Sequence, residues 1–224
     1  MRRVTLPALV ISLCLASLAP VALAAEAGPV ESRVWPPHAQ RARGLLLGGG
    51  FGVSGCTDDL CDDLDPLVYL KLHGLARIFN HLAVGLQLGL SFHDPDNRYT
   101  DVVLDTFIGL EVRGILPLGR FDLWTGIALG YMRHQRDGEV CTAWTCYDGS
   151  AWHDGFGFGW GFGALLHVTR SVAIGLDFWL YKPAYTSECW DGQLVGHGCD
   201  DPPDEDVYGI TWNFGVTALW FMPF

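Results

Sequence analysis

The chain has 224 residues, of which 50% are hydrophobic and 17% are charged. This hydrophobic content excludes an intrinsically disordered protein. The 28 glycines argue against a mainly helical protein, because glycine is costly inside helices. A formal net charge of −11 leaves no basic surface for nucleic acid, so we expect no nucleic-acid partner.

The first residues have the pattern of an export signal. Two arginines precede a long uncharged stretch, which ends in a small-x-small sequence at residues 22–24. A membrane helix is the alternative, but Pro7 and Pro20 interrupt the apolar run. We therefore predict a signal peptide over residues 1–24 that is cleaved on export. Residues 25–42 contain three prolines and no periodicity, which predicts a short periplasmic linker.

From residue 43 onward, hydrophobic residues recur at every second position. This period indicates β-strands, because successive side chains of a strand point to opposite faces. Eight segments show the pattern: residues 43–54, 67–79, 82–93, 101–116, 121–134, 154–168, 172–182 and 207–222.

The connections between these segments alternate in length. Tight turns fall at residues 80–81, 118–120 and 169–171. The other connections are longer and rich in Asp, Gly and Pro: residues 55–66, 93–101, 135–154 and 183–206. The predicted fold class is therefore all-β, an eight-stranded antiparallel transmembrane up-and-down β-barrel over residues 43–224. In such a barrel the short turns face the periplasm and the long loops face outside.

A soluble eight-stranded barrel, whose apolar row would point inward, is the main alternative. Residues 154–168 argue against it, because their other row is almost entirely glycine, whereas a water-facing row should be polar. The apolar rows are also too uniformly bulky to fill the small interior of eight strands. We therefore expect the apolar rows to face lipid.

Export and an even number of cysteines in the mature chain predict disulfides. All six lie in the predicted long loops and none in a predicted strand, so pairing within each loop is the simplest arrangement. A metal site is the alternative, but no Cys-x-x-Cys pair is present. The candidate disulfide residues are Cys56, Cys61, Cys141, Cys146, Cys189 and Cys199.

The same loops carry many acidic residues. A solvated rim is the simpler interpretation, and a weak divalent-cation site is the alternative, since hard cations take several carboxylate oxygens. Two clusters stand out: Asp58, Asp59, Asp62, Asp63 and Asp65 in the first loop, and Glu188, Asp191, Asp200, Asp201, Asp204, Glu205 and Asp206 in the last.

The loops also carry aromatic and histidine side chains. Trp144, Tyr147, Trp152 and Trp190 predict either packing between loops or recognition of a ligand or another cell surface. Of the histidines in or beside the loops, we expect His134, His153 and His197 to be solvated.

The inward rows should carry the polar side chains of the barrel. Their nearly balanced charges predict a closed, salt-bridged plug, because a buried charge must be paired. A narrow polar channel is the alternative. The predicted lumen charge network consists of Lys71, Arg77, Asp105, Glu111, Arg113, Asp122 and Asp177.

The glycines of residues 154–168 should pair across the following turn with larger residues. Counting from that turn pairs Gly159 with Tyr181, Gly161 with Trp179, and Gly163 with Asp177. Either these glycines make room for large neighbours, or they line a cavity toward the outer leaflet that could take an acyl chain.

We expect no enzyme, no catalytic residue, no metal and no cofactor. Ser91 and His93 share an inward row, but two residues on one strand lie about 7 Å apart along its axis, beyond hydrogen-bond reach. His73 and His93 should differ in height within the barrel, so they do not form one metal site.

The C-terminal sequence resembles the assembly signal of outer-membrane barrels, with a polar residue, a glycine two positions later, hydrophobic positions and a terminal aromatic. The matching residues are Asn213, Gly215, Ala218, Trp220 and Phe224. With the strand pattern, residues 43–224 resemble the small eight-stranded barrels of the OmpA/OmpX type. The resemblance implies insertion by the barrel-assembly machinery into the bacterial outer membrane.

On these grounds we expect a monomeric barrel in contact with outer-membrane lipids and lipopolysaccharide. Its predicted role is structural or surface-binding, with disulfide-stapled acidic loops outside. A narrow pore or hydrophobic conduit for small molecules is the alternative.

Overall fold

The computed structural model describes residues 43–57, 64–95, 100–141, 146–192, 196–201 and 209–223. The predicted signal peptide and linker lie outside the described residues. The described chain forms strands β1 (Gly44–Cys56), β2 (Leu64–Phe79), β3 (Leu82–Pro95), β4 (Thr100–Leu118), β5 (Phe121–Cys141), β6 (Cys146–His167), β7 (Val172–Gly192), β8 (Gly196–Asp200) and β9 (Thr211–Pro223). No helix among the described residues is long and apolar enough to cross a membrane.

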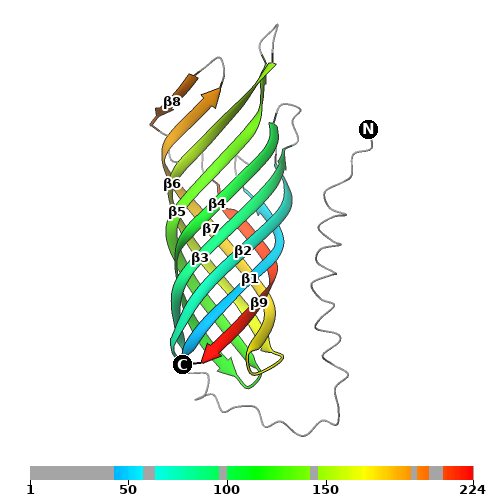
Figure 1. Ribbon diagram of the computed structural model, residues 1–224, viewed down its shortest axis with the longest axis vertical. Helices are drawn as coiled ribbons and strands as arrows, with labels where there is room; N and C mark the ends of the chain where they lie inside the picture. Colours follow the sequence, from blue (N-terminus) through cyan, green and yellow to red (C-terminus); the bar gives the residue numbers. More distant parts are fainter. Residues whose placement is uncertain are drawn as a thin grey trace, which may run out of the picture. The chain divides into compact units, whose positions relative to one another are not determined.

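Eight of these strands close into a barrel (Figure 1). Strands β1 to β7 pair in sequence order, β7 also pairs with β9, and β9 pairs with β1, always antiparallel. Strand β8 is an additional short strand that folds back onto the far end of β7. The predicted eight-stranded antiparallel up-and-down barrel is therefore confirmed, with β9 as its eighth strand.

The two faces of the barrel wall differ sharply in chemistry. On β3, Leu86 is 62% exposed while its neighbour Gln87 is 2% exposed. On β7, Leu176 is exposed and Asp177 is buried. Bulky apolar side chains thus cover the outside, and the buried polar and charged side chains lie inside, together with an apolar and aromatic core. An apolar outer surface with charges inside is the reverse of a water-soluble barrel.

The exposed apolar side chains form a belt of limited height. On β5 the belt extends from Phe121, next to the β4–β5 turn, to Tyr131, and the outward residue beyond it is Arg133. Ten strand rises at the tilt usual for barrels give about 25 Å along the axis, which matches the apolar band of outer-membrane barrels.

Several predicted loops are instead strands that continue past this belt. Residues 135–141 and 146–154 extend β5 and β6 into one long hairpin, and residues 183–192 extend β7. Figure 1 shows the β5–β6 hairpin reaching beyond the other strand ends. The prediction that no cysteine lies in a strand was therefore wrong, because Cys56, Cys141, Cys146, Cys189 and Cys199 all lie within strands.

Candidate functional site

The barrel interior is the candidate site, and its polar side chains form three groups along the axis. We call them the turn-end, middle and outer groups, in order from the short turns toward the long strand ends. All seven residues of the predicted lumen charge network lie in these groups, and each is at most 4% exposed.

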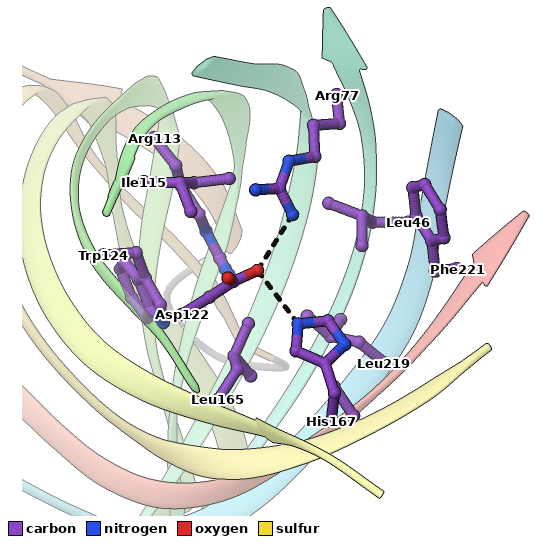
Figure 2. A pocket seen from close by; sticks show the side chains of 11 residues that line it. Leu46, Arg77, Arg113, Ile115, Asp122, Trp124, Leu165, His167, Leu219 and Phe221 are labelled. Atoms are coloured by element: carbon purple, nitrogen blue, oxygen red, sulfur yellow. Dashed lines mark hydrogen bonds and ion pairs between the residues drawn. The ribbon is translucent and has the colours of Figure 1, made fainter. Parts of the chain in front are cut away.

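The turn-end group is centred on the carboxylate of Asp122 (Figure 2). Arg77 donates from Nη1 to Asp122 Oδ2 at 2.8 Å, and His167 Nε2 lies 2.9 Å from the same oxygen. A second guanidinium nitrogen of Arg77 donates to the carbonyl of Asn80 at 2.7 Å, which ties the group to the β2–β3 turn.

Apolar side chains surround this group and close the turn end of the lumen. The cavity that remains among them has a volume of about 10 Å³, space for roughly one water molecule. Its apolar lining comes from Leu46, Ile115, Leu165, Leu219 and Phe221, which all belong to the buried core.

The middle group contains two ion pairs. Lys71 on β2 pairs across the lumen with Asp177 on β7, and Arg113 pairs with Glu111 on the same strand, β4. Arg113 also donates to His73 Nδ1 at 3.1 Å. Because a guanidinium has only donors, His73 accepts at Nδ1 and is therefore the neutral tautomer with its proton on Nε2.

Aromatic rings pack against these cations. The Arg113 guanidinium lies 4.0 Å from the centre of the Trp124 ring, and Lys71 Nζ lies 5.5 Å from the Trp179 ring. The two tryptophan rings are 5.6 Å apart. The rings therefore fill the space around the charges and add cation–π attraction where water is excluded.

The glycine row of β6 makes room for these rings. Gly159 pairs with Tyr181, Gly161 with Trp179 and Gly163 with Asp177, the register expected from the sequence. A Cβ atom added at Gly161 would overlap the Trp179 ring, and one added at Gly159 would lie 2.8 Å from the Tyr181 ring. The glycines thus accommodate large neighbours, as the first of the two interpretations proposed.

The outer group is centred on Asp105 of β4. Its two carboxylate oxygens bind His134 Nδ1 at 2.6 Å and His93 Nε2 at 3.0 Å. Thr211 on β9 donates to the carboxylate at 3.4 Å, and Arg136 donates to His134 Nε2 at 3.0 Å. Four strands of the barrel therefore meet at this carboxylate.

Sequence reasoning missed part of the outer group. His134 and His153 were expected to be solvated, but they are 4% and 7% exposed and face the interior on β5 and β6. The inward position of His134 was predictable, because it lies an even number of residues from Trp124, Ala128 and Met132, which face the interior on the same strand. His197, the third of these histidines, is exposed as expected.

Neutral polar side chains fill the space between the middle and outer groups. Ser91 donates to Asn213 Oδ1 at 3.2 Å, and Gln87 bonds the Tyr181 hydroxyl. Ser91 and His93 therefore have separate partners, and His73 and His93 belong to different groups. The described residues contain no cluster of His, Cys, Asp and Glu that could hold a metal ion.

An ion pair marks the outer edge of the apolar belt on the lipid side of the wall. Arg133 on β5 donates to both oxygens of Asp154 on β6, at 2.6 and 2.8 Å, and Tyr131 bonds the same carboxylate. Burial raises the pKa of Asp154, but the bonds from Arg133 and Tyr131 outweigh it and hold that pKa below its ordinary value. The pair stays ionised where the belt ends.

The structure describes one local disulfide among the cysteines of the long strand ends. Cys189 on β7 and Cys199 on β8 form a disulfide, and Cys56 is also disulfide-bonded. Cys141 and Cys146 lie directly opposite each other in the β5–β6 register. Cys61 lies outside the described residues.

Most of the acidic loop residues also lie outside the described residues. Asp65, Glu188, Asp191, Asp200 and Asp201 are described, and each is exposed or partly exposed. Most of the predicted cation site, Trp144 and the side chain of Tyr147 therefore lie outside the part of the chain that the structure describes.

The C-terminal strand places its signal residues on both faces. Asn213 and Gly215 face the interior, whereas Ala218 and Trp220 face outward, Trp220 with 58% of its surface exposed. Phe224 lies outside the described residues.

Comparisons with known proteins agree on the fold. No family model matches the chain, and no curated protein matches its sequence. Among solved structures, a major outer membrane protein from Thermus thermophilus superposes with a TM-score of 0.63 at 13% identity, covering 81% of this chain and 100% of that one. Neisserial surface protein A gives 0.56 at 10% identity, covering 80% and 97%. OprG from Pseudomonas aeruginosa gives 0.52 at 13% identity, covering 80% and 96%.

The chain has the fold of a small outer-membrane β-barrel. The likeness spans nearly the whole of each compared structure and includes the ring of antiparallel strands. This agrees with the resemblance to OmpA/OmpX-type barrels that the sequence pattern indicates.

Proposed function

We propose that the protein is an integral outer-membrane barrel that is closed to solutes and serves as a rigid anchor for the surface formed by its long strand ends. The observation that carries this proposal is the filled lumen. Ion pairs and aromatic rings occupy the axis, and two cavities among the described residues each hold about 10 Å³. A hydrated ion or an acyl chain needs far more space than one water molecule.

The long strand ends support a structural or surface-binding role. A disulfide holds β8 against β7, and the Trp152 ring lies 6.1 Å from the His197 ring and 5.6 Å from the Arg133 guanidinium. Such a rigid, mixed aromatic and charged surface loses little conformational entropy on binding a partner. Outer-membrane lipids and lipopolysaccharide would contact the belt below it.

Conductance in planar bilayers tests the closed lumen. We expect the folded protein to show no conductance steps, and we expect none from Trp179→Ala, because the turn-end group would still close the lumen after this buried ring is removed. Trp220→Ala removes a ring of the same size from the lipid face and should also produce no conductance steps. Regular steps from the unmodified protein would contradict the proposal and favour the pore alternative.

The outward position of Trp220 also supports insertion through the barrel-assembly machinery, as the C-terminal pattern implies. We expect Trp220→Ala to reduce the amount of folded protein in the outer membrane. The matched control is Trp160→Ala, which removes an exposed outward ring from β6. Equal amounts of the two variants would contradict a special role for the C-terminal strand.

A further inference from the structure

On three neighbouring strands, the apolar belt ends in a charged residue on the lipid side of the wall. Arg133 on β5 is the next outward residue after Tyr131, and Asp154 on β6 is the next one beyond Phe156. Lys182 on β7 also points outward and is exposed. The outer edge of the belt therefore carries two cations and one carboxylate on the face formed by β5, β6 and β7.

Arg133 and Lys182 are the only cations on the outward face in the part of the chain that the structure describes. Arg136 bonds the inward-facing His134. The other described lysines and arginines lie in the lumen or at the turn end: Lys71, Arg77 and Arg113, and Arg43, Arg120 and Arg170. Both outward cations thus lie at the edge of the belt, the level at which the charged headgroups of the outer leaflet begin.

Arg133 is held in one orientation and keeps one side of its guanidinium available. Its Nε and Nη2 donate to the two oxygens of Asp154 at 2.6 and 2.8 Å. The guanidinium also lies 5.9 Å from the Tyr131 ring and 5.6 Å from the Trp152 ring. Nη1 makes no hydrogen bond to a described residue, and the side chain is 38% exposed. Because a guanidinium has five N–H donors, the edge formed by Nη1 and Nη2 can bind a second oxyanion.

The carboxylate of Asp154 limits the kind of anion that this edge can bind. A bare phosphate would be attracted by Arg133 and repelled by Asp154. A ligand that also brings hydroxyl groups removes this conflict, because a hydroxyl can donate to the carboxylate. The partly exposed Trp152 ring offers an apolar surface to the ring carbons of a sugar. The cluster therefore fits a phosphorylated sugar better than a simple phosphate.

Exposed aromatic rings lie on the belt side of the charged cluster. Phe156 is 70% exposed and Phe158 is 47% exposed. Lys182 pairs with Phe158, four residues along β6 from Asp154, which is about 13 Å at the usual strand rise. Lys182 therefore contacts a different part of a headgroup from Arg133, and the two rings lie where acyl chains would begin.

We propose that this face of β5, β6 and β7 binds a phosphorylated glycolipid of the outer leaflet, the chemistry of lipopolysaccharide. Arg133 and Lys182 contact its phosphates, and Asp154 accepts from its sugar hydroxyls. Phe156 and Phe158 contact its acyl chains. This inference rests on the proposed function, because only a barrel inserted in the outer membrane presents this face to such a lipid.

Native mass spectrometry of the folded protein in zwitterionic detergent micelles tests the site, with purified lipid A as the probe. We expect one lipid A to bind to each barrel. Phosphatidylglycerol, which has a phosphate and no sugar, and lipid A stripped of its phosphates should each bind at least about tenfold more weakly. One charge-assisted contact between arginine and phosphate is strong enough to account for a factor of ten.

Two variants and one control identify the residues responsible. Arg133→Gln and Lys182→Gln should each weaken lipid A binding at least about tenfold. Arg170→Gln removes an exposed arginine from the β6–β7 turn, at the opposite end of the barrel, and should leave binding unchanged. The proposal is overturned if either comparison lipid binds as tightly as lipid A, or if either variant binds like the unmodified protein. If Arg133→Gln fails to fold, Lys182→Gln alone decides.

Two further measurements separate this site from the proposed function. A gel band that heating shifts shows that each variant has folded, and planar bilayers report whether its lumen is closed. A folded, non-conducting barrel that does not bind lipid A would overturn the glycolipid site and leave the closed barrel standing. Conductance steps from a barrel that does bind lipid A would overturn the closed lumen and support the site.

Discussion

The buried charges of the lumen are neutralised by specific partners, some of them from distant parts of the chain. Lys71 and Asp177 are 106 residues apart in sequence, yet both are essentially inaccessible and paired with each other. Removing one partner would leave the other buried and uncompensated, which costs more free energy than removing both. This asymmetry gives a direct test of the pairing.

We predict that Asp177→Asn lowers the free energy of unfolding by about 3–5 kcal/mol, because Lys71 would remain buried without its carboxylate. The double variant Lys71→Met, Asp177→Leu should recover most of that loss, since neither buried charge remains. Urea unfolding in lipid vesicles measures both values. Equal losses in the single and double variants would show that the two side chains are not coupled.

A second prediction at this scale concerns pH. Burial and the charges of His134 and Arg136 hold the pKa of His153 at about 4 in the folded protein, against an ordinary value of 6.5. Between these values unfolding takes up a proton, so stability should fall as the pH is lowered from about 6.5 to 4 and be unaffected by this group above that range. Unfolding midpoints measured across this range should depend less on pH in His153→Gln. An identical slope in that variant would contradict the assignment.

At the scale of strands, the sequence predicts the wall of the barrel well wherever one face meets an apolar surrounding. From Phe121 to Tyr131 the outward residues are apolar or small, and the inward ones are polar, small or aromatic, so the period of two is plain. From Arg133 to Asp137, consecutive residues of β5 are polar on both faces, which is why residues 135–154 resembled a loop. Only backbone pairing with β6 shows that they continue the strand.

The sequence does not show which charged side chains of the lumen pair with each other. Parity shows that Lys71, Glu111 and Asp177 point inward, but not which cation reaches which carboxylate, because that depends on the stagger of all eight strands. Pairings across a single short turn were predictable, as those of the β6 glycines show. Contacts across the lumen, such as Arg77 with Asp122, were not.

The strand extensions beyond the belt are where disulfides matter most. The bond between Cys189 and Cys199 holds the short strand β8 on β7, and the β5–β6 register places Cys141 opposite Cys146. We predict that the folded mature protein has no free thiol, with Cys56 bonded to Cys61 and Cys141 to Cys146. Alkylation without reductant, followed by mass spectrometry of peptides, checks this. Labelling of Cys141 or Cys146 before reduction would contradict the predicted pair.

For the molecule as a whole, we infer that the bulky apolar face of the wall contacts hydrocarbon. The exposed belt would cost too much free energy in water, and the buried charges would have no role in a soluble barrel of this size. Both features follow if lipid surrounds the belt and the lumen is a closed core. The polar strand ends then project from one side of the membrane.

Refolding of the mature chain from urea, with and without lipid vesicles, distinguishes a belt that contacts lipid from a barrel that is soluble in water. Circular dichroism reports the β-sheet, and a compact gel band that heating converts to a slower one reports the closed barrel. We predict that both appear with vesicles and that neither appears in buffer alone, where the chain should aggregate. A soluble, folded β-sheet protein obtained without lipid or detergent would contradict contact between the belt and hydrocarbon.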